Sequence, residues 1–199
     1  MTRVAVIGSA GRTGRRVVAA AIAKGWIATG LQHQPAAGLP VVVGDASDPG
    51  TVADAVRDAD LVVCALGGDA DGCLRATRVL VDVLRERGPR RIIAITGAMV
   101  GHPPEQLPWL YRAIRRGLRG QLEPRREQER LIRESGLDWT IVRPPRLTDR
   151  RPRGEVVAAD DIPIRLFDDL SRDTLADFLV GDGAGPRYIR RSVALVERR

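Results

Sequence analysis

Short apolar runs alternate with segments of helical periodicity along most of the chain. The helical segments are 14–24, 49–58, 72–87 and 125–134, where apolar residues recur three or four positions apart. Strands that alternate with helices are typical of a parallel sheet covered by helices on both faces. The pattern therefore predicts an α/β fold with a doubly wound parallel sheet, as a single domain over 1–199. The predicted strands are 4–7, 26–31, 41–46, 60–68, 91–96 and 139–142, the fourth of them ending in small residues.

The turn after the first predicted strand is rich in glycine, with the spacing G-x-x-G-x-x-G. Strand, glycine turn and helix is the context in which backbone amides approach a phosphate closely, because no Cβ atom intervenes. The amides at the start of the following helix then point at that phosphate. A tight turn selected for packing alone is the alternative. The residues predicted to bind the cofactor here are Gly8, Ser9, Ala10, Gly11, Arg12, Thr13 and Gly14.

The end of the second predicted strand bears on which dinucleotide binds. An acidic residue about 20 positions after the glycines would hold the 2′-hydroxyl of NAD. This chain has Gln32, His33 and Gln34 there, and its first acidic residue is Asp45. An acidic side chain would repel a 2′-phosphate, whereas Arg12 could bind one. The sequence therefore favours NADP(H) over NAD(H), with His33 as either a cofactor contact or an ordinary loop histidine.

Other candidate residues follow the later strands, because ligands of open α/β sheets bind at the carboxyl ends of the strands. Asp45 could contact the adenine or could cap the next helix, although Ser47 and Asp48 suit the cap better. Thr96 could hydrogen-bond the cofactor or a carbonyl group, or could simply end a strand as a β-branched residue. The predicted cofactor contacts of this group are Asp45, Ala65, Leu66, Gly67 and Thr96, and the turn after the sixth strand, Pro144-Pro145, could form the wall of a pocket.

Residues 101–124 are the least regular part of the chain, with four prolines and three glycines. We expect a loop or lid over the site. Trp109 and Tyr111 could face a flat substrate there, and the arginines could attract an anionic one; a solvated basic loop is the alternative. Residues 147–199 are expected to form a short C-terminal extension on the substrate side. Its predicted elements are a strand at 156–157, a helix from about 171 and a strand at 193–196.

Composition and charge narrow the class of protein. The net charge of +7 is carried almost wholly by arginine, with Lys24 as the only lysine. Three Trp, two Tyr and two Phe are too few to form a base-stacking surface, so we expect no nucleic-acid partner. No apolar run is long enough for a membrane span, and the first strand begins too early to leave room for a signal peptide. We expect a cytoplasmic protein that acts on a small molecule, as a monomer or small homo-oligomer.

The two cysteines, Cys64 and Cys73, lie in apolar surroundings and have no neighbours with metal-ligand spacing. We expect buried thiols and no metal site.

Several motifs together resemble a known family. The glycine turn, VVVGDASD, DLVVCALG, IIAIT and RESGLDWTIVRPPRLTD resemble the atypical short-chain dehydrogenase/reductases with an NAD(P)H-binding domain. Within that group the chain is most similar to flavin reductase/biliverdin-IX-beta reductase and to NmrA-like proteins, over roughly residues 3–180. The resemblance implies a Rossmann fold and an NADP(H) site at the carboxyl ends of the strands. By carry-over from the family, that site would include Gly8 to Gly14, His33, Asp45, Ala46, Ala65, Leu66, Gly67, Thr96, Pro144 and Pro145.

The catalytic residues of that family are only partly matched. Short-chain dehydrogenases use a Ser or Thr, a Tyr that donates the proton, and a Lys that lowers the pKa of the Tyr. Here Gly97 stands at the usual Ser position and Arg125 where a Lys is often found. Tyr111 and Arg115 mimic the Tyr–Lys spacing, but an arginine does not deprotonate and is a poor proton relay. The candidate catalytic residues are Thr96, Tyr111 and Arg125.

Two functions are compatible with these residues. The first is an NADPH-dependent reductase that transfers hydride to a planar conjugated acceptor such as a flavin, tetrapyrrole or quinone, with the proton from solvent or Thr96. The second is a non-catalytic NADP(H)-binding redox sensor of the NmrA-like type. Gly97 and the missing Lys favour the sensor, whereas the short C-terminal extension favours the reductase. An isomerase or epimerase would need a Tyr–Lys pair that the sequence does not provide.

Overall fold

The structure is a computed structural model. It describes the backbone of residues 1–36, 38–101, 109–117, 119–160, 162–163, 165 and 167–198. Within these ranges it leaves out the side chains of Tyr111, Ile114, Arg115, Arg116 and Arg119.

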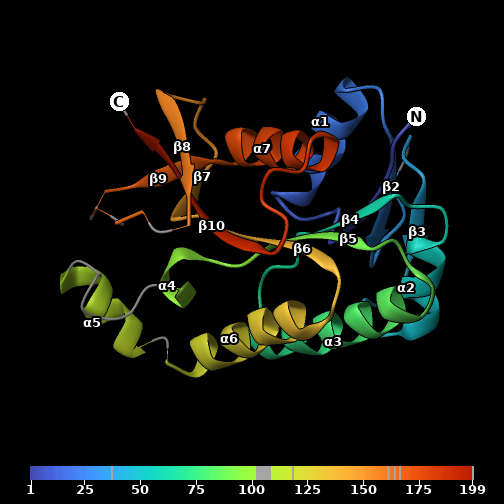
Figure 1. The fold of residues 1–199 in the computed structure, drawn as a ribbon, viewed down its shortest axis with the longest axis horizontal. Coiled ribbons are helices and arrows are strands. Elements are labelled where there is room, and N and C mark those ends of the chain that lie inside the picture. Colours follow the sequence, from blue (N-terminus) through green and yellow to red (C-terminus); the bar gives the residue numbers. More distant parts are fainter. Residues whose placement is uncertain are drawn as a thin grey trace.

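An eight-stranded sheet forms the centre of the molecule, with the order β3-β2-β1-β4-β5-β6-β10-β8 (Figure 1). All neighbouring strands are parallel except β8, which runs antiparallel to β10. This topology confirms the predicted doubly wound sheet. The strands are β1 Arg3–Ile7, β2 Ile27–Gln32, β3 Val41–Val43, β4 Leu61–Cys64, β5 Arg91–Ile95, β6 Asp138–Arg143, β8 Glu155–Ala159 and β10 Arg191–Arg198.

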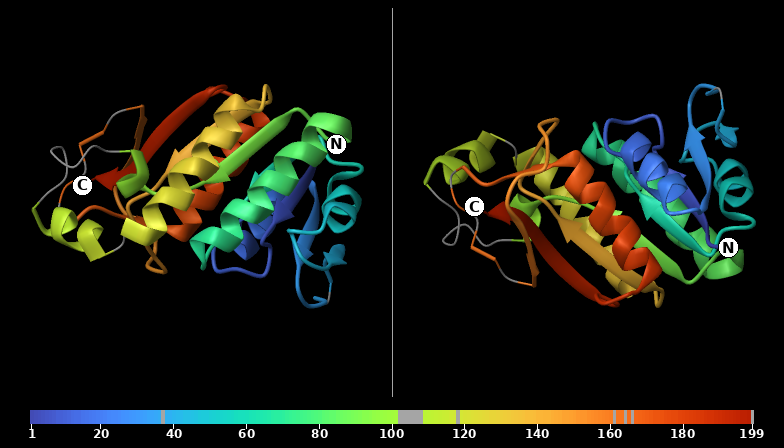
Figure 2. Two further views of the ribbon diagram at one scale, coloured as in Figure 1. Left: turned by 90° about the horizontal axis from the view of Figure 1, so that it is seen from below. Right: turned by 90° about the horizontal axis from the view of Figure 1, so that it is seen from above.

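Helices cover both faces of the sheet. In Figure 1, α1 and α7 lie above the sheet and α2, α3 and α6 lie below it; Figure 2 shows each layer face-on. A small second sheet of β7 (Arg146–Thr148) and β9 (Asp169–Ser171) lies beside the carboxyl end of β6. The covering helices are α1 Gly14–Ala23, α2 Pro49–Val56, α3 Ala70–Arg87, α6 Arg119–Glu134 and α7 Arg172–Ala184.

The two layers of core follow from the alternation of side chains along each strand. In β1, Val4 and Val6 pack with α1 and α7, whereas Ala5 and Ile7 pack against α2, α3 and α6. A strand buried on both faces has to be apolar throughout, and burying one such side chain contributes about 1.5–3 kcal/mol. This double burial explains why the strands read as continuous apolar runs in the sequence.

The loop expected over 101–124 is wrong for most of the described residues of that segment. Short helix α4 (Ala98–Gly101) reaches its first residue, α5 spans Trp109–Gly117, and α6 begins at Arg119. Of the four prolines in the segment, Pro124 lies within α6, and the other three lie outside the described residues. Near the start of α6, the side chain of Leu122 is buried.

Residues 147–199, expected as a short C-terminal extension, contribute two strands to the main sheet in their described part. The predicted helix and both strands are present as α7, β8 and β10. However, β10 pairs with β6 inside the main sheet, and α7 packs beside α1 in the upper layer. The described residues therefore form one domain around the eight-stranded sheet, with the small β7–β9 sheet beside it.

Candidate functional site

The glycine turn is fixed by close backbone contacts. Gly8 has a φ of +85°, and its N–H donates to the carbonyl oxygen of Leu31 in β2 at 3.0 Å. A Cβ atom added to Gly14 would lie 2.1 Å from the carbonyl oxygen of Gly8. Both positions therefore require glycine, and the turn brings the start of α1 against the carboxyl ends of β1 and β2.

The start of α1 differs from the starts of α2, α3 and α7. In those three helices, Asp48, Asp69 and Ser171 accept hydrogen bonds from first-turn amides. Within the described part of the chain, α1 has no such side-chain cap at Thr13 and no acidic residue in its first turn. An uncapped helix start with positive partial charge, reached through a turn without Cβ atoms, suits a phosphate. The residues therefore fit the pyrophosphate of a dinucleotide.

Buried polar contacts order the end of β2 beside this turn. The Ser9 hydroxyl donates to the side-chain oxygen of Gln32 at 2.7 Å, and the Gln32 amide donates to the carbonyl of Gln34 at 2.6 Å. Ser9 and Gln32 are both buried. His33, between the two glutamines, is exposed. This arrangement leaves His33 exposed at the carboxyl end of β2.

Charged groups surround the same end of the sheet. Asp45 accepts a hydrogen bond from the Ser47 N–H at 2.7 Å, and this bond, together with the charges of His33 and Arg75, lowers the pKa of Asp45. Arg12 is exposed, with its guanidinium 3.6 Å from the Asp149 carboxylate. Arg12 is therefore only loosely held and remains free to contact an anion.

Two neighbouring cavities lie at the carboxyl ends of β4, β5 and β6. The narrower one has a volume of about 200 Å³ and the wider one about 690 Å³. They share Thr96, Val100 and Leu147, so Thr96 stands at their junction. The narrow cavity is lined by Thr13, Ala65, Leu66, Gly67, Ile95, Thr96, Val100, Arg125 and Leu147. The wide cavity is lined by Thr96, Gly97, Ala98, Met99, Val100, Leu110, Leu122, Pro144, Pro145, Arg146, Leu147 and Phe167.

A buried carboxylate holds the Thr96 side chain at that junction. The Thr96 hydroxyl donates to Glu129 Oε1 at 2.7 Å. Glu129 is 1% exposed and also accepts from Arg143 Nε at 3.0 Å and from Arg133 Nη2 at 2.6 Å. Arg143 in turn lies under α4, because a Cβ atom on Gly101 would be 2.2 Å from its guanidinium carbon. The cluster thus joins the ends of β5 and β6 to α4 and α6.

Arg125 lines the narrow cavity but is tied to the protein. Its Nη1 donates to Gln128 at 3.0 Å, and buried Gln128 donates to Thr77 at 2.9 Å. Burial raises the pKa of the nearby Cys73 thiol, an effect that the Arg125 charge partly offsets. Arg125 therefore supplies a positioned positive charge.

The structure does not support the predicted substrate contact of Trp109, and the side chain of Tyr111 is not described. Trp109 is 72% exposed and does not line either cavity, so the structure gives no support to its contact with a flat ligand. The Tyr111 side chain lies outside the described part of the chain. Sequence reasoning missed Arg146 and Phe167 at the wide cavity, and it took Glu129 only as a helix partner of Arg133.

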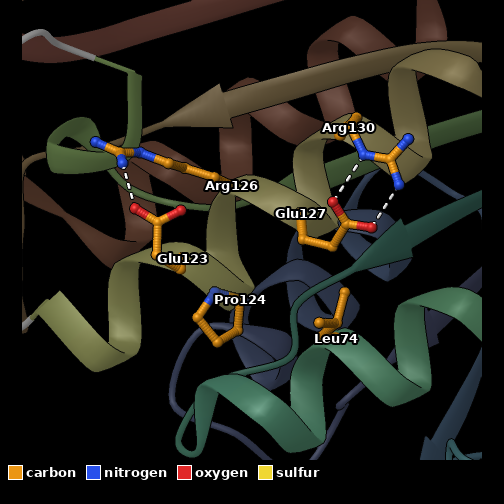
Figure 3. A pocket seen from close by; sticks show the side chains of 6 residues that line it. All are labelled: Leu74, Glu123, Pro124, Arg126, Glu127 and Arg130. Atoms are coloured by element: carbon orange, nitrogen blue, oxygen red, sulfur yellow. Dashed lines mark hydrogen bonds and ion pairs between the residues drawn. The ribbon is translucent and has the colours of Figure 1, made fainter.

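A third hollow lies between α3 and α6, away from Thr96, and is lined by charged pairs. Figure 3 shows that Arg126 points to Glu123 and that Arg130 points to Glu127, with Leu74 of α3 opposite. Because these charges satisfy each other, the hollow is a weaker candidate for a ligand.

No described helix is long and apolar enough to cross a membrane. Among the described residues, no group of three or more His, Cys, Asp or Glu could hold a metal ion.

Comparison with known proteins shows the family of this chain and structural relatives of its fold. The sequence profile described as NAD(P)H-binding matches residues 8–181. The anaerobillin reductase ChuY of Escherichia coli O157:H7 superposes with a TM-score of 0.84 at 22% identity, covering 98% of this chain and 97% of that one. A short-chain dehydrogenase/reductase of Veillonella parvula DSM 2008 in complex with NADP gives 0.84 at 17% identity, covering 98% and 94%. The oxidoreductase ylbE of Lactococcus lactis gives 0.85 at 14% identity, covering 100% and 92%.

Proposed function

Because the chain belongs to the NAD(P)H-binding family, we propose that it is an NADPH-dependent reductase of a planar conjugated acceptor. The observation that carries this proposal is the junction of the two cavities at Thr96. The narrow cavity continues from Thr13 of the glycine turn, and the wide one opens beyond it. A dinucleotide laid along the strand ends would therefore present its nicotinamide to the wide cavity.

The chain's own residues divide the binding of the dinucleotide among them. The glycine turn and the uncapped start of α1 bind the pyrophosphate, and Ala65, Leu66 and Gly67 let the nucleotide pass close to the backbone. Arg12 and His33 receive the 2′-phosphate, in a region without acidic residues before Asp45. Bound there, the cofactor supplies the hydride. The protein contributes orientation, which can remove several kcal/mol from a barrier, on the order of 7–11 at best.

The wide cavity determines the class of acceptor. Its volume of about 690 Å³ lies in the range of small-molecule sites, and most of its lining is apolar. Arg146 is the charged residue among the lining residues, and its side chain is 71% exposed. A flat apolar molecule with an anionic group near Arg146 fits this arrangement. A flavin or a tetrapyrrole has this chemistry, and one structural relative is itself an anaerobillin reductase.

A non-catalytic NADP(H) sensor is the second candidate. Gly97 at the wide cavity and the hydrogen-bonded Arg125 leave the Ser and Lys roles of the short-chain dehydrogenases unfilled. Hydride transfer to an extended conjugated system does not need those roles, since the proton can come from water. The sensor therefore becomes the better proposal only if binding occurs without turnover.

The first experiment measures NADPH oxidation with FMN, riboflavin, biliverdin and small quinones, together with calorimetric titration of NADPH and NADH. Turnover with any acceptor supports the reductase. Tight binding of NADPH without turnover supports the sensor, and binding of neither dinucleotide contradicts both.

The Arg146 contact has its own test. FMN carries a phosphate that riboflavin lacks, so Arg146→Ala should raise KM for FMN about tenfold and leave KM for riboflavin unchanged. Arg85→Ala, which removes an exposed arginine of α3 that lines neither cavity, is the matched control. Equal changes for the two flavins would contradict a role for Arg146 in anion recognition.

A further inference from the structure

The hydrogen-bonding state of Thr96 is determined by Glu129. A threonine hydroxyl has one hydrogen to donate and two lone pairs to accept with, whereas a carboxylate only accepts. The 2.7 Å contact therefore commits the single hydrogen of Thr96 to Glu129 Oε1. What remains available to a ligand at the junction of the cavities is the hydroxyl oxygen, as an acceptor.

The carboxylate that takes this hydrogen has little freedom to turn away. Glu129 accepts twice from Arg143 and once from Arg133 in addition to Thr96. Arg143 is itself 13% exposed and covered by α4 at Gly101. A residue that only stabilised α6 through its pair with Arg133 would not need contacts to the ends of two strands.

We propose that Glu129 is a positioning residue that makes Thr96 a hydrogen-bond acceptor for an amide N–H at the reaction site. This inference rests on the proposed NADPH-dependent reductase. The amide is the carboxamide of the nicotinamide or the ring imide N–H of a flavin-type acceptor. Since the hydrogen of Thr96 is already engaged, the proton that completes the reduction comes from water.

The first test is binding, which needs no turnover. Thr96→Val should weaken NADPH binding about tenfold, the effect of one lost hydrogen bond, and Thr96→Ser should retain it. Adenosine 2′,5′-bisphosphate lacks the nicotinamide, so its affinity should not change. The 3-acetylpyridine analogue of NADPH lacks the amide N–H, and Thr96→Val should change its affinity less than twofold.

The second test identifies the other source of the amide. If the acceptor provides the N–H, Thr96→Val should raise KM for riboflavin about tenfold, leave KM for 3-methylriboflavin unchanged and not affect NADPH binding. In both cases kcat should fall less than threefold. A fall in the turnover rate by about two orders of magnitude or more, typical of a removed general acid, would overturn the assignment of the proton to water.

Glu129→Gln tests the positioning role itself. The amide would offer one oxygen to two arginines and turn its N–H₂ toward Thr96. The Thr96 hydroxyl would then accept from this amide with one lone pair and regain a free hydrogen, so it would no longer present only acceptor sites to the ligand. Glu129→Gln should weaken binding of the amide-bearing ligand as much as Thr96→Val does. The double variant should bind that ligand no more weakly than either single variant. Unchanged binding of adenosine 2′,5′-bisphosphate shows that the variant is folded.

The inference is overturned if Thr96→Val weakens NADPH and adenosine 2′,5′-bisphosphate equally, or if it alters neither NADPH binding nor KM for riboflavin. Additive losses for Glu129→Gln and Thr96→Val would overturn the role of Glu129. Failure of the wild-type protein to bind either dinucleotide is a different result, because it contradicts the proposed function as a whole.

Discussion

The carbonyl oxygen of Gly8 occupies the space that any side chain at Gly14 would need. An added Cβ atom would lie 2.1 Å from that oxygen, a contact that backbone atoms cannot relieve without moving the whole turn. The same turn contains the proposed pyrophosphate site. The shape of that site therefore depends on the close approach of Gly14 to the Gly8 carbonyl.

Gly14→Ala should therefore abolish dinucleotide binding, with an affinity loss of at least about 100-fold and a lower melting temperature. Gly181→Ala is the matched control, because it lies in helix α7 with nothing within 4 Å of its added Cβ. That change should raise stability by up to about 1 kcal/mol, since alanine favours helix over glycine. Calorimetry and thermal unfolding measure both effects, and normal binding by Gly14→Ala would contradict the proposed site.

Arg12 is expected to discriminate between the two dinucleotides. Arg12→Ala should weaken NADPH about tenfold or more and NADH less than twofold, because only NADPH carries the 2′-phosphate. Arg15→Ala removes an exposed arginine of the next helical turn and should leave the ratio unchanged. Similar losses for both dinucleotides would place Arg12 at the pyrophosphate instead.

The two cysteines should be unreactive in the folded protein. Burial raises the pKa of Cys64 to about 11 and also raises that of Cys73. At pH 8 only about 0.1% of Cys64 would be thiolate, so a thiol-reactive dye should label the native protein slowly and both cysteines rapidly in denaturant. Fast labelling of the native protein would contradict the burial of these side chains.

The same shifts predict how stability depends on alkaline pH. The folded pKa values lie above the ordinary value of 9.0, so the unfolded chain loses these protons first as the pH rises. The contribution to stability is complete below about pH 9 and is lost as the pH rises toward 11. The variant Cys64→Ala/Cys73→Ala should lack this component in unfolding titrations.

Replacing Asp182 of α7, which lies beside the start of β5, should lower the stability of the protein strongly. Asp182 is 4% exposed, pairs with Arg91 and accepts from the Arg187 N–H at 2.9 Å. Asp182→Ala would leave the Arg91 charge largely buried and should cost about 3–5 kcal/mol. Asp160→Ala, which breaks an exposed pair with Arg191, should shift the denaturation midpoint far less.

The sequence predicted the parts of the fold that depend on local pattern. The buried strands, the glycine turn and the cap at Asp48 each follow from a few neighbouring residues. The helix α5 was missed because prolines and glycines on either side of it suggested a loop. Spacing alone cannot tell a helix between breaks from an irregular segment.

The missed parts of the site depend on contacts between distant residues. Glu129 and Arg133 are four positions apart, and their pairing was predicted from the helix alone. The contacts of Glu129 with Thr96 and Arg143 depend on how α6 packs against the sheet, which no local pattern encodes. For the same reason Arg146 and Phe167 carried no signal as cavity residues.

The position of β10 has a consequence for the order in which the chain can assemble. β8 comes before β10 in the sequence. In the described structure, however, β10 lies between β6 and β8, so β8 joins the sheet only by pairing with β10. During synthesis β8 would emerge with its sheet partner still inside the ribosome. Because β10 is synthesised after every other strand of the sheet, we expect this edge to form last during synthesis, after β1, β4 and β5 have already joined.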